Sequence, residues 1–223
     1  MYEQAFRDED VAESDLVTRR GTFRAVAFRA DGHEHMALVH GKTRMREHVL
    51  VRVHSECMTG DIFGAMRCEC GEQLDAALDA IVREGNGILV YLRGHEGRGI
   101  GLVEKVRTHV LQDEQGLDTL DSATTLGLPV DVRDYTPAAL VLRHLRVQSV
   151  RLMSNNPDKI AALEQNGIRV TARVPLLISP NTHNVNYLLA KRNRLGHDLP
   201  QVDGPALKST VDASASARRQ GIG

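Results

Sequence analysis

Three closely spaced cysteines constrain this chain more than any other feature of its sequence. Cys57, Cys68 and Cys70 follow the spacing C-x10-C-x-C, and they are the only cysteines among the 223 residues. In an extended segment alternate side chains share a face, so Cys68 and Cys70 can meet one ion, and the glycine-containing loop before them can return Cys57 to the same point. The pattern therefore predicts a metal site built from three thiolates.

A site with three thiolates leaves one tetrahedral position free. A catalytic zinc needs such a position for water, whereas a structural zinc normally has a fourth cysteine or histidine. We expect one catalytic Zn2+ per chain and keep two alternatives, a structural site closed by His54 and three buried thiols that bind no metal. Because thiolates donate charge to zinc, water bound there should be less acidic than on a three-histidine site, and a nearby general base becomes useful.

The composition is that of an ordinary globular protein. The chain has 28 lysines and arginines against 29 aspartates and glutamates, so neither nucleic acid nor a membrane surface is an expected partner. Residues 1–15 are acidic and lack the features of a secretory signal, and no later stretch reaches the roughly 18 apolar residues of a membrane span. We expect a cytoplasmic protein with reduced thiols.

The pattern of apolar residues predicts strands first and helices later. Residues 22–30, 36–40 and 48–54 are rich in β-branched residues and separated by turns, which predicts a β-meander. From Gly71 apolar residues recur at helical spacing as far as Gly85, a typical residue after a helix C-terminus, so an amphipathic helix is expected there.

Strands and helices then alternate along the rest of the chain. The patterns lie at residues 88–92, 102–112, 136–145, 149–153 and 157–167. They predict an α/β (α+β) fold, in which the N-terminal β-meander packs with a mixed, partly parallel sheet flanked by helices. In such folds sites form at the carboxyl ends of the strands.

Two predicted loops between a strand and a helix are typical of anion sites. In Glu96-Gly97-Arg98-Gly99-Ile100-Gly101 the glycines let the backbone approach a ligand and Arg98 adds donors. Residues 154–159 bring a serine hydroxyl and Lys159 to the start of a helix. Alone, the first loop is equally typical of a tight connection and the second of an ordinary capped helix. Their recurrence in one chain favours phosphate binding.

A carboxylate and a guanidinium lie two residues apart, at Asp131 and Arg133. If this segment is extended, the two side chains can point the same way. The alternative is a surface ion pair, which is common and contributes little.

Six motifs, in this order, resemble those of the GTP cyclohydrolase II family. They are Arg52-Val53-His54-Ser55-Glu56-Cys57, Arg67-Cys68-Glu69-Cys70-Gly71, Glu96-Gly97-Arg98, Leu111-Gln112-Asp113, Asp131-Val132-Arg133-Asp134-Tyr135 and Ser154-Asn155-Asn156-Pro157. An ordered set is far more specific than any one motif. We therefore predict a catalytic domain at residues 21–199, an N-terminal segment at 1–20, and a tail at 200–223 whose composition predicts disorder.

The resemblance implies a homodimeric enzyme that needs Zn2+ and Mg2+ and catalyses the first step of riboflavin synthesis. GTP would yield 2,5-diamino-6-(5-phosphoribosylamino)pyrimidin-4(3H)-one, formate and diphosphate. The resemblance also implies that Cys57, Cys68 and Cys70 bind zinc. The GTP site that it implies is lined by Arg52, Val53, His54, Ser55, Glu56, Gln73, Glu96, Gly97, Arg98, Thr119, Ser154 and Lys159.

The same resemblance makes Asp131 the proton acceptor and Arg133 the nucleophile at the α-phosphorus. A guanidinium is almost always protonated, so stabilising the charge of the phosphates is the competing role for Arg133. Mg2+ is expected on the triphosphate oxygens.

This sequence departs from the family pattern mainly at His109, where a tyrosine is usual. Imidazole is shorter than phenol and titrates near neutrality, so a contact near zinc could be lost. Our hypothesis is that the ring opens while the formyl group is retained, and the alternative is that His109 is a harmless residue on the helix surface. Asp121-Ser122-Ala123 in place of Glu-Ala-Asn and Ser154 in place of threonine are the other departures.

Three other functions were weighed against this one. His54-Ser55-Glu56 has the H-x-E form of zinc deaminases, but their Pro-Cys-x-x-Cys partner is absent from the sequence. A protein that binds GTP and keeps zinc without turnover is a second alternative. An RNA-binding module fits poorly, because the sequence has neither a basic stripe nor interleaved aromatic residues.

Overall fold

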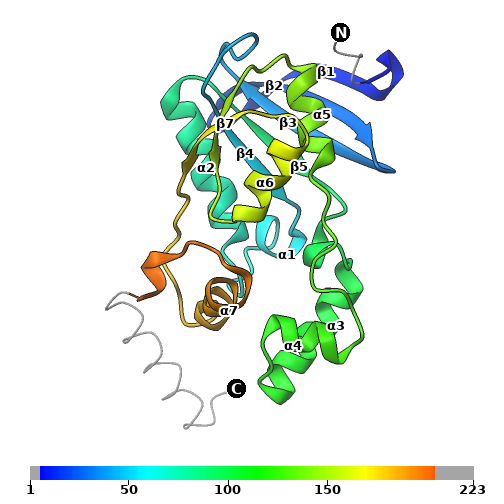
Figure 1. Ribbon diagram of the computed structural model, residues 1–223, viewed down its shortest axis with the longest axis vertical. Helices are drawn as coiled ribbons and strands as arrows, with labels where there is room; N and C mark the ends of the chain where they lie inside the picture. Colours follow the sequence, from blue (N-terminus) through cyan, green and yellow to red (C-terminus); the bar gives the residue numbers. More distant parts are fainter. Residues whose placement is uncertain (1–5, 204–223) are drawn as a thin grey trace.

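The computed structural model describes residues 6–203. It has one mixed sheet of seven strands in the order β1-β2-β3-β5-β4-β6-β7 (Figure 1). The strands are Val11–Thr18 (β1), Gly21–Ala30 (β2), His33–His40 (β3), Val49–Ser55 (β4), Gly87–Leu92 (β5), Val150–Met153 (β6) and Val170–Val174 (β7). The predicted α/β class with a mixed, partly parallel sheet is confirmed.

The sheet changes from antiparallel to parallel pairing at β5. The strands β1, β2, β3 and β5 pair antiparallel in turn, whereas β5, β4, β6 and β7 pair parallel. Three neighbouring parallel strands, β5, β4 and β6, therefore end at the same edge of the sheet. The segments that follow these strands carry Glu96, Cys57 and Ser154, so this edge is the expected place for a site.

The predicted β-meander is correct only for its first two strands. The strand β2 pairs with β3 as an antiparallel hairpin, but β4 is not the neighbour of β3, because β5 lies between them. Six of the seven residues of β4 are buried, so this strand needs partners on both edges and cover on both faces. Residues 1–20 were expected to lie outside the sheet, yet β1 extends it as a mostly exposed edge strand.

The structure contains seven α-helices and three short 3-10 helices among the residues described. They are Met58–Asp61 (α1), Cys70–Glu84 (α2), Leu102–Gln115 (α3), Thr119–Thr125 (α4), Thr136–His144 (α5), Pro157–Gln165 (α6), Val185–Leu195 (α7), Asp8–Asp10 (η1), Glu96–Arg98 (η2) and Pro200–Asp203 (η3). The sequence patterns predicted α2, α3, α5 and α6, and they missed α1, α4, α7 and β7. Gly85 adopts a left-handed conformation after α2, as expected of a C-terminal glycine.

Helices cover both faces of the sheet and enclose two clusters of buried side chains. On one face Val51 and Val90 pack with α5 and α6, for example with Leu142 and Leu163. On the other face Ala77 and Ile81 of α2 pack against Leu50 and Leu89. Burial of such side chains stabilises the fold by about 1.5–3 kcal/mol for each large one.

Three helices, α3, α4 and α7, lie beyond the carboxyl edge of the parallel strands (Figure 1). Asp118 caps α4 by accepting hydrogen bonds from Leu120 N and Asp121 N, and its carboxylate also pairs with Arg194 of α7. The sheet and these helices together enclose the space described below.

The predicted tail lies mostly outside the described residues. Its first residues form η3, in which Val202 is fully buried, so residues 200–203 belong to the folded part. Within residues 6–203, no helix is both long and apolar enough to cross a membrane.

Candidate active site

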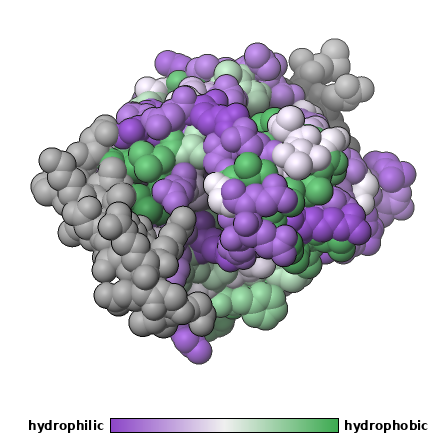
Figure 2. Space-filling model, turned by 90° about the horizontal axis from the view of Figure 1, so that it is seen from below, coloured by the Kyte–Doolittle hydropathy of each residue, from purple (hydrophilic) through white to green (hydrophobic). Residues whose placement is uncertain are grey.

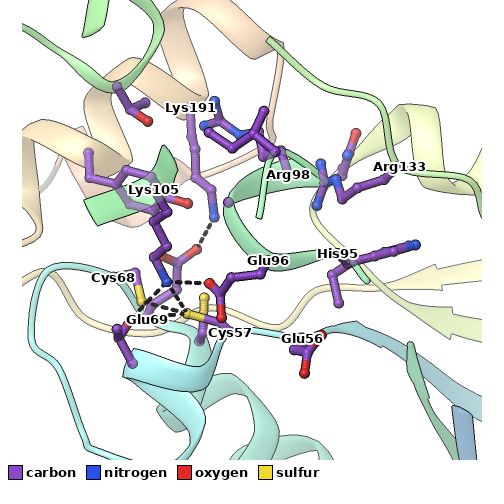
Figure 3. Close-up of a pocket in the computed structure, with 18 of the residues that line it drawn as sticks. Glu56, Cys57, Cys68, Glu69, His95, Glu96, Arg98, Lys105, Arg133 and Lys191 are labelled. Carbon is purple, nitrogen blue, oxygen red and sulfur yellow. Dashed lines mark hydrogen bonds and ion pairs between the residues drawn. The ribbon is translucent and has the colours of Figure 1, made fainter. Parts of the chain in front are cut away.

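A cavity lies at the carboxyl edge of the parallel strands (Figure 3). Its walls come from the end of β4 and the loop after it, from the glycine loop after β5, from α3, and from α7. Seven lysine and arginine side chains line it, against three glutamates: Arg52, Arg67, Arg98, Lys105, Arg133, Lys159 and Lys191 against Glu56, Glu69 and Glu96. This excess of positive charge suits an anionic ligand.

The three cysteine thiols meet at one side of this cavity. Their Sγ atoms all lie within 4.8 Å of one another, and the Sγ atoms of Cys57 and Cys68 are 3.7 Å apart. Two thiolates on one tetrahedral zinc, each at about 2.3 Å, would lie about 3.8 Å apart. The donor set therefore fits a zinc ion, and in the described part of the chain it is the only group of three or more His, Cys, Asp or Glu side chains so arranged.

The local backbone differs from the extended segment that was expected. Cys68 lies in a bend, Glu69 has φ −99° and ψ 13°, and Cys70 is the first residue of α2. Gly60 in α1 makes the close approach possible, because a Cβ atom there would lie 3.0 Å from the Sγ atom of Cys68 and 3.2 Å from that of Cys57. The thiols thus converge through a helix start and a glycine, not through strand alternation.

The thiols share their negative charge unequally. Hydrogen bonds with Cys68 and Cys70, followed by the nearby charge of Lys105, lower the pKa of Cys57. The same bond to Cys57 raises the pKa of Cys68 to about 11, and the pKa of Cys70 is raised as well. A metal must therefore displace protons from these two thiols when it binds.

Lys105, on the second turn of α3, faces the cysteines. Its Nζ atom donates to the Sγ atom of Cys57 at 3.2 Å, to Thr59 Oγ1 at 2.7 Å and to Glu96 Oε1 at 2.6 Å. The other carboxylate oxygen of Glu96 accepts from Met58 N at 2.6 Å. Glu96 was expected to line a GTP site, and its two oxygens here join the glycine loop to the cysteine segment.

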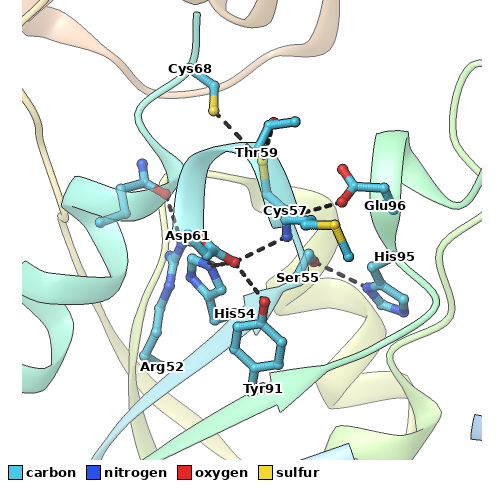
Figure 4. A network of polar contacts seen from close by, with 12 residues as sticks. Arg52, His54, Ser55, Cys57, Thr59, Asp61, Cys68, Tyr91, His95 and Glu96 are labelled. Carbon is cyan, nitrogen blue, oxygen red and sulfur yellow. Dashed lines mark hydrogen bonds and ion pairs between the residues drawn. The ribbon is translucent and has the colours of Figure 1, made fainter. Parts of the chain in front are cut away.

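His54 belongs to a buried network below the cysteines (Figure 4). Its Nε2 atom lies 3.0 Å from Asp61 Oδ1, and its ring stacks on Tyr91, whose hydroxyl also donates to Asp61. Asp61 in turn accepts from Cys57 N at 3.0 Å. Because His54 is held in this way and lies outside the group that could hold an ion, the alternative of a site closed by His54 is not supported within residues 6–203.

A second polar chain runs along the opposite wall. Arg52 donates to Gln73 at 2.7 Å, Gln73 donates to Glu69 at 3.3 Å, and Lys191 of α7 donates to Glu69 at 2.6 Å. The Lys191 ammonium also lies 4.7 Å from the centre of the Tyr187 ring. The side chains of Glu69 and Lys191 are only 3% and 13% exposed, so this ion pair is buried.

The glycine loop lies between β5 and α3, as predicted. Gly97, Gly99 and Gly101 have φ of 61°, 91° and 90°, in the left-handed region that favours glycine. A Cβ atom at Gly97 would lie 2.8 Å from Ile100, and one at Gly99 would lie 2.7 Å from Val132. These glycines keep the loop tight against the segment that carries the aspartate and arginine pair.

Asp131 and Arg133 form a bidentate ion pair at the cavity. Arg133 Nε donates to Asp131 Oδ1 at 2.8 Å, and the second contact joins Arg133 NH2 to Asp131 Oδ2. Burial opposes the charge on both groups, but the pairing prevails, so the pKa of Arg133 is raised and that of Asp131 is lowered. Lys159, deeply buried, donates to the backbone oxygen of Val53 at 2.9 Å, and both Lys159 and Arg133 lie against the ring of Tyr135.

Nearly all side chains predicted for the site do line this cavity. The exceptions among the described residues are Val53, which packs in the core and offers its backbone oxygen, and Asp131, which reaches the cavity through Arg133. His109 and Thr119, from α3 and α4, are part of the lining. Burial and then the charges of Arg67 and Lys105 lower the pKa of His109, so its imidazole is neutral at pH 7.

Four further side chains in the lining were not predicted: Lys105, Tyr187, Lys191 and His197. Lys105 follows the last glycine of the glycine loop by four residues, a spacing that could have suggested it. The other three come from α7 and the residues after it, where the sequence carries no recognisable motif.

Comparison with known proteins gives a consistent result. The family model for GTP cyclohydrolase II matches residues 9–175. Riboflavin biosynthesis protein RibBA of Mycobacterium ulcerans is 50% identical over 201 residues, which are 87% of this chain and 47% of that protein. RibBA of Salinispora arenicola is 53% identical over 191 residues, or 85% and 45% of the two chains. This chain thus spans about half the length of the curated relatives it matches.

Among solved structures, RibBX of A. baumannii, a two domain 3,4-dihydroxy-2-butanone 4-phosphate synthase, matches 68% of this chain and 36% of its own. The TM-score is 0.37 and the identity 18%, a likeness too weak to bear on function.

Proposed function

Because the chain belongs to the GTP cyclohydrolase II family, we propose that it opens the imidazole ring of GTP in a zinc-dependent reaction and releases formate and diphosphate. The product is 2,5-diamino-6-(5-phosphoribosylamino)pyrimidin-4(3H)-one, the first intermediate of riboflavin synthesis. The observation that carries this proposal is the group of three thiols in the same cavity as the cluster of basic side chains. A metal that activates water and a triphosphate site then lie within reach of one nucleotide.

Cys57, Cys68 and Cys70 would hold the zinc. When bound, zinc supplies an activated water for attack on C8 of guanine and for hydrolysis of the resulting formamide. The triphosphate is held by basic side chains and by the N-terminus of α6, where Asn156 caps the helix. Mg2+ accompanies the triphosphate and binds mainly to its oxygens.

Arg133 stabilises the charge on the phosphates. Its pKa is raised because Asp131 pairs with both edges of the guanidinium, so the group keeps its proton. A protonated guanidinium is a strong bidentate donor and a poor nucleophile. Asp131, whose pKa is lowered by the same pair, stays ionised and orients Arg133.

Retention of the formyl group is the second candidate outcome, and His109 is the observation that favours it. His109 lines the cavity that holds the cysteines, and its neutral imidazole is shorter than the tyrosine usual in the family. Ring opening and deformylation need different contacts, so one step can slow without the other.

Mass spectrometry of the products tests these proposals. Protein loaded with zinc is incubated with GTP and Mg2+, and the nucleotide products, formate and diphosphate are followed together. A diaminopyrimidine with equimolar formate supports the full reaction, and a product that keeps the formyl group supports the second candidate. GTP that stays bound and unchanged would contradict both and favour a binding protein.

We also propose a homodimer. The support is a set of exposed apolar side chains on α3 and on the loop between Cys57 and Cys68: Ile62, Phe63, Met66, Leu102, Val103, Val106 and Val110. Figure 2 shows apolar areas among polar ones on the face seen from below. Sedimentation analysis of the protein and of a Val106→Glu variant checks this, and a monomeric wild-type chain at micromolar concentration contradicts it.

A further inference from the structure

Lys105 joins three parts of the site through one ammonium group. All three of its N–H donors are used, on the thiol of Cys57, on the hydroxyl of Thr59 and on the carboxylate of Glu96. The side chain is only 12% exposed, and Figure 3 shows it between the cysteines and Glu96. Such a fully engaged, nearly buried cation has one position, not the range of a surface lysine.

Glu96 fixes Lys105 from the side away from the cysteines. Its Oε1 atom accepts from Lys105, and its Oε2 atom accepts from the backbone N–H of Met58, the residue directly after Cys57. The glycine loop, α3 and the cysteine segment are therefore tied together around one sulfur. A movement of any of them would displace the Sγ atom of Cys57.

A cation against a thiolate also changes its electronic properties. Three thiolates on a divalent ion carry a net charge of −1, and an ammonium at hydrogen-bond distance offsets that excess and withdraws charge from one sulfur. Hydrogen bonds to ligating sulfur tune the metal in this way in other metalloproteins. Less charge donated by the thiolates leaves the metal a stronger Lewis acid, which a site with three thiolates needs.

We propose that Lys105 is a positioning residue of the metal centre, which holds the Sγ atom of Cys57 and lowers the charge that this sulfur donates to the bound metal. The inference rests on the proposed metal site. It gives Glu96 the task of anchoring Lys105, in addition to any contact with the substrate.

Cobalt(II) replaces zinc as the probe, because its thiolate-to-metal charge-transfer band in the near ultraviolet reports the charge on the sulfurs. The band is compared in wild-type protein, in Lys105→Met and in Lys105→Gln. Arg107→Met is the matched control, since Arg107 lies on the same helix with a side chain that is 63% exposed and paired only locally with Glu104 among the described residues.

We expect the band of Lys105→Met to shift to longer wavelength, because the thiolate loses a neighbouring positive charge. The band of Lys105→Gln should lie in between, and that of Arg107→Met should match the wild type. Zinc affinity of Lys105→Met, measured by competition with a chromophoric chelator, should fall by about tenfold or more.

Unchanged band and affinity in folded Lys105→Met would overturn the inference. If the methionine variant does not fold, as judged by circular dichroism, the position of the Lys105→Gln band decides in the same way. A wild-type protein that binds cobalt without any thiolate charge-transfer band would instead refute the metal site itself, so the two failures can be told apart.

Discussion

Gly60 offers a direct test of how the three thiols are brought together. In Gly60→Ala the new Cβ atom would lie 3.0 Å from the Sγ atom of Cys68, 3.2 Å from that of Cys57 and 3.1 Å from Cys70 Cβ. These separations are shorter than ordinary van der Waals contact, so at least one sulfur must move by a few tenths of an ångström. Zinc requires sulfurs at about 2.3 Å in tetrahedral geometry, which leaves little tolerance for that movement.

The expected magnitude follows from the cost of overpacking. Inserting one methyl group into a tightly packed site costs about 1–3 kcal/mol. If this cost falls on the metal-bound state, zinc affinity drops by about 5- to 150-fold, since 1.4 kcal/mol corresponds to a factor of ten. Competition with a chromophoric chelator measures it.

Met66→Ala is the matched control, because Met66 lies in the same loop and is 55% exposed. It should bind zinc like the wild type. A Gly60→Ala protein that is folded and binds zinc with unchanged affinity would refute the claim that the thiols converge on one ion.

Three further predictions concern buried charges. Lys191→Met leaves the carboxylate of Glu69 buried without its cation and should lower the free energy of unfolding by about 3 kcal/mol in urea titrations; an unchanged value refutes the buried pair. Burial, followed by the charge of Arg133, lowers the pKa of His95 to about 4, below the unfolded value of about 6.5, so protonation favours unfolding and stability is lost as pH falls from about 6.5 towards 4. His95→Gln should flatten that part of the stability profile, and an unchanged slope contradicts this. Arg133→Ala should slow diphosphate release by about 100-fold or more, and intact mass spectrometry of wild-type protein with GTP should detect no nucleotide adduct; a covalent adduct at Arg133 would contradict its electrostatic role.

Much of the site could be predicted because its chemistry depends on rare residues in ordered motifs. The cysteine spacing predicts the thiol group, and the position of the glycine loop between a strand and a helix predicts a wall of the cavity. The reason given for the convergence of Cys68 and Cys70 was wrong, since a helix start and not an extended segment brings them together. Residue spacing fixes which side chains can meet but does not distinguish these two backbones.

Other features depend on contacts between distant parts of the chain. The place of β5 between β3 and β4 follows from pairing across the sheet, which a pattern of apolar residues does not encode. Lys191 belongs to the site only because α7 packs across the cavity to reach Glu69, which is 122 positions earlier in the chain. A lone lysine on an otherwise ordinary amphipathic helix gives no signal of such a partner.

Titration of metal-free protein with zinc tests the central claim most directly. Formate and diphosphate release from GTP are measured at each step, in the presence of Mg2+. The account predicts that both rates rise linearly and saturate at one zinc per chain, and that a Cys68→Ser variant shows no such rise. Full turnover by the metal-free chain, or saturation with zinc without any product, would contradict it.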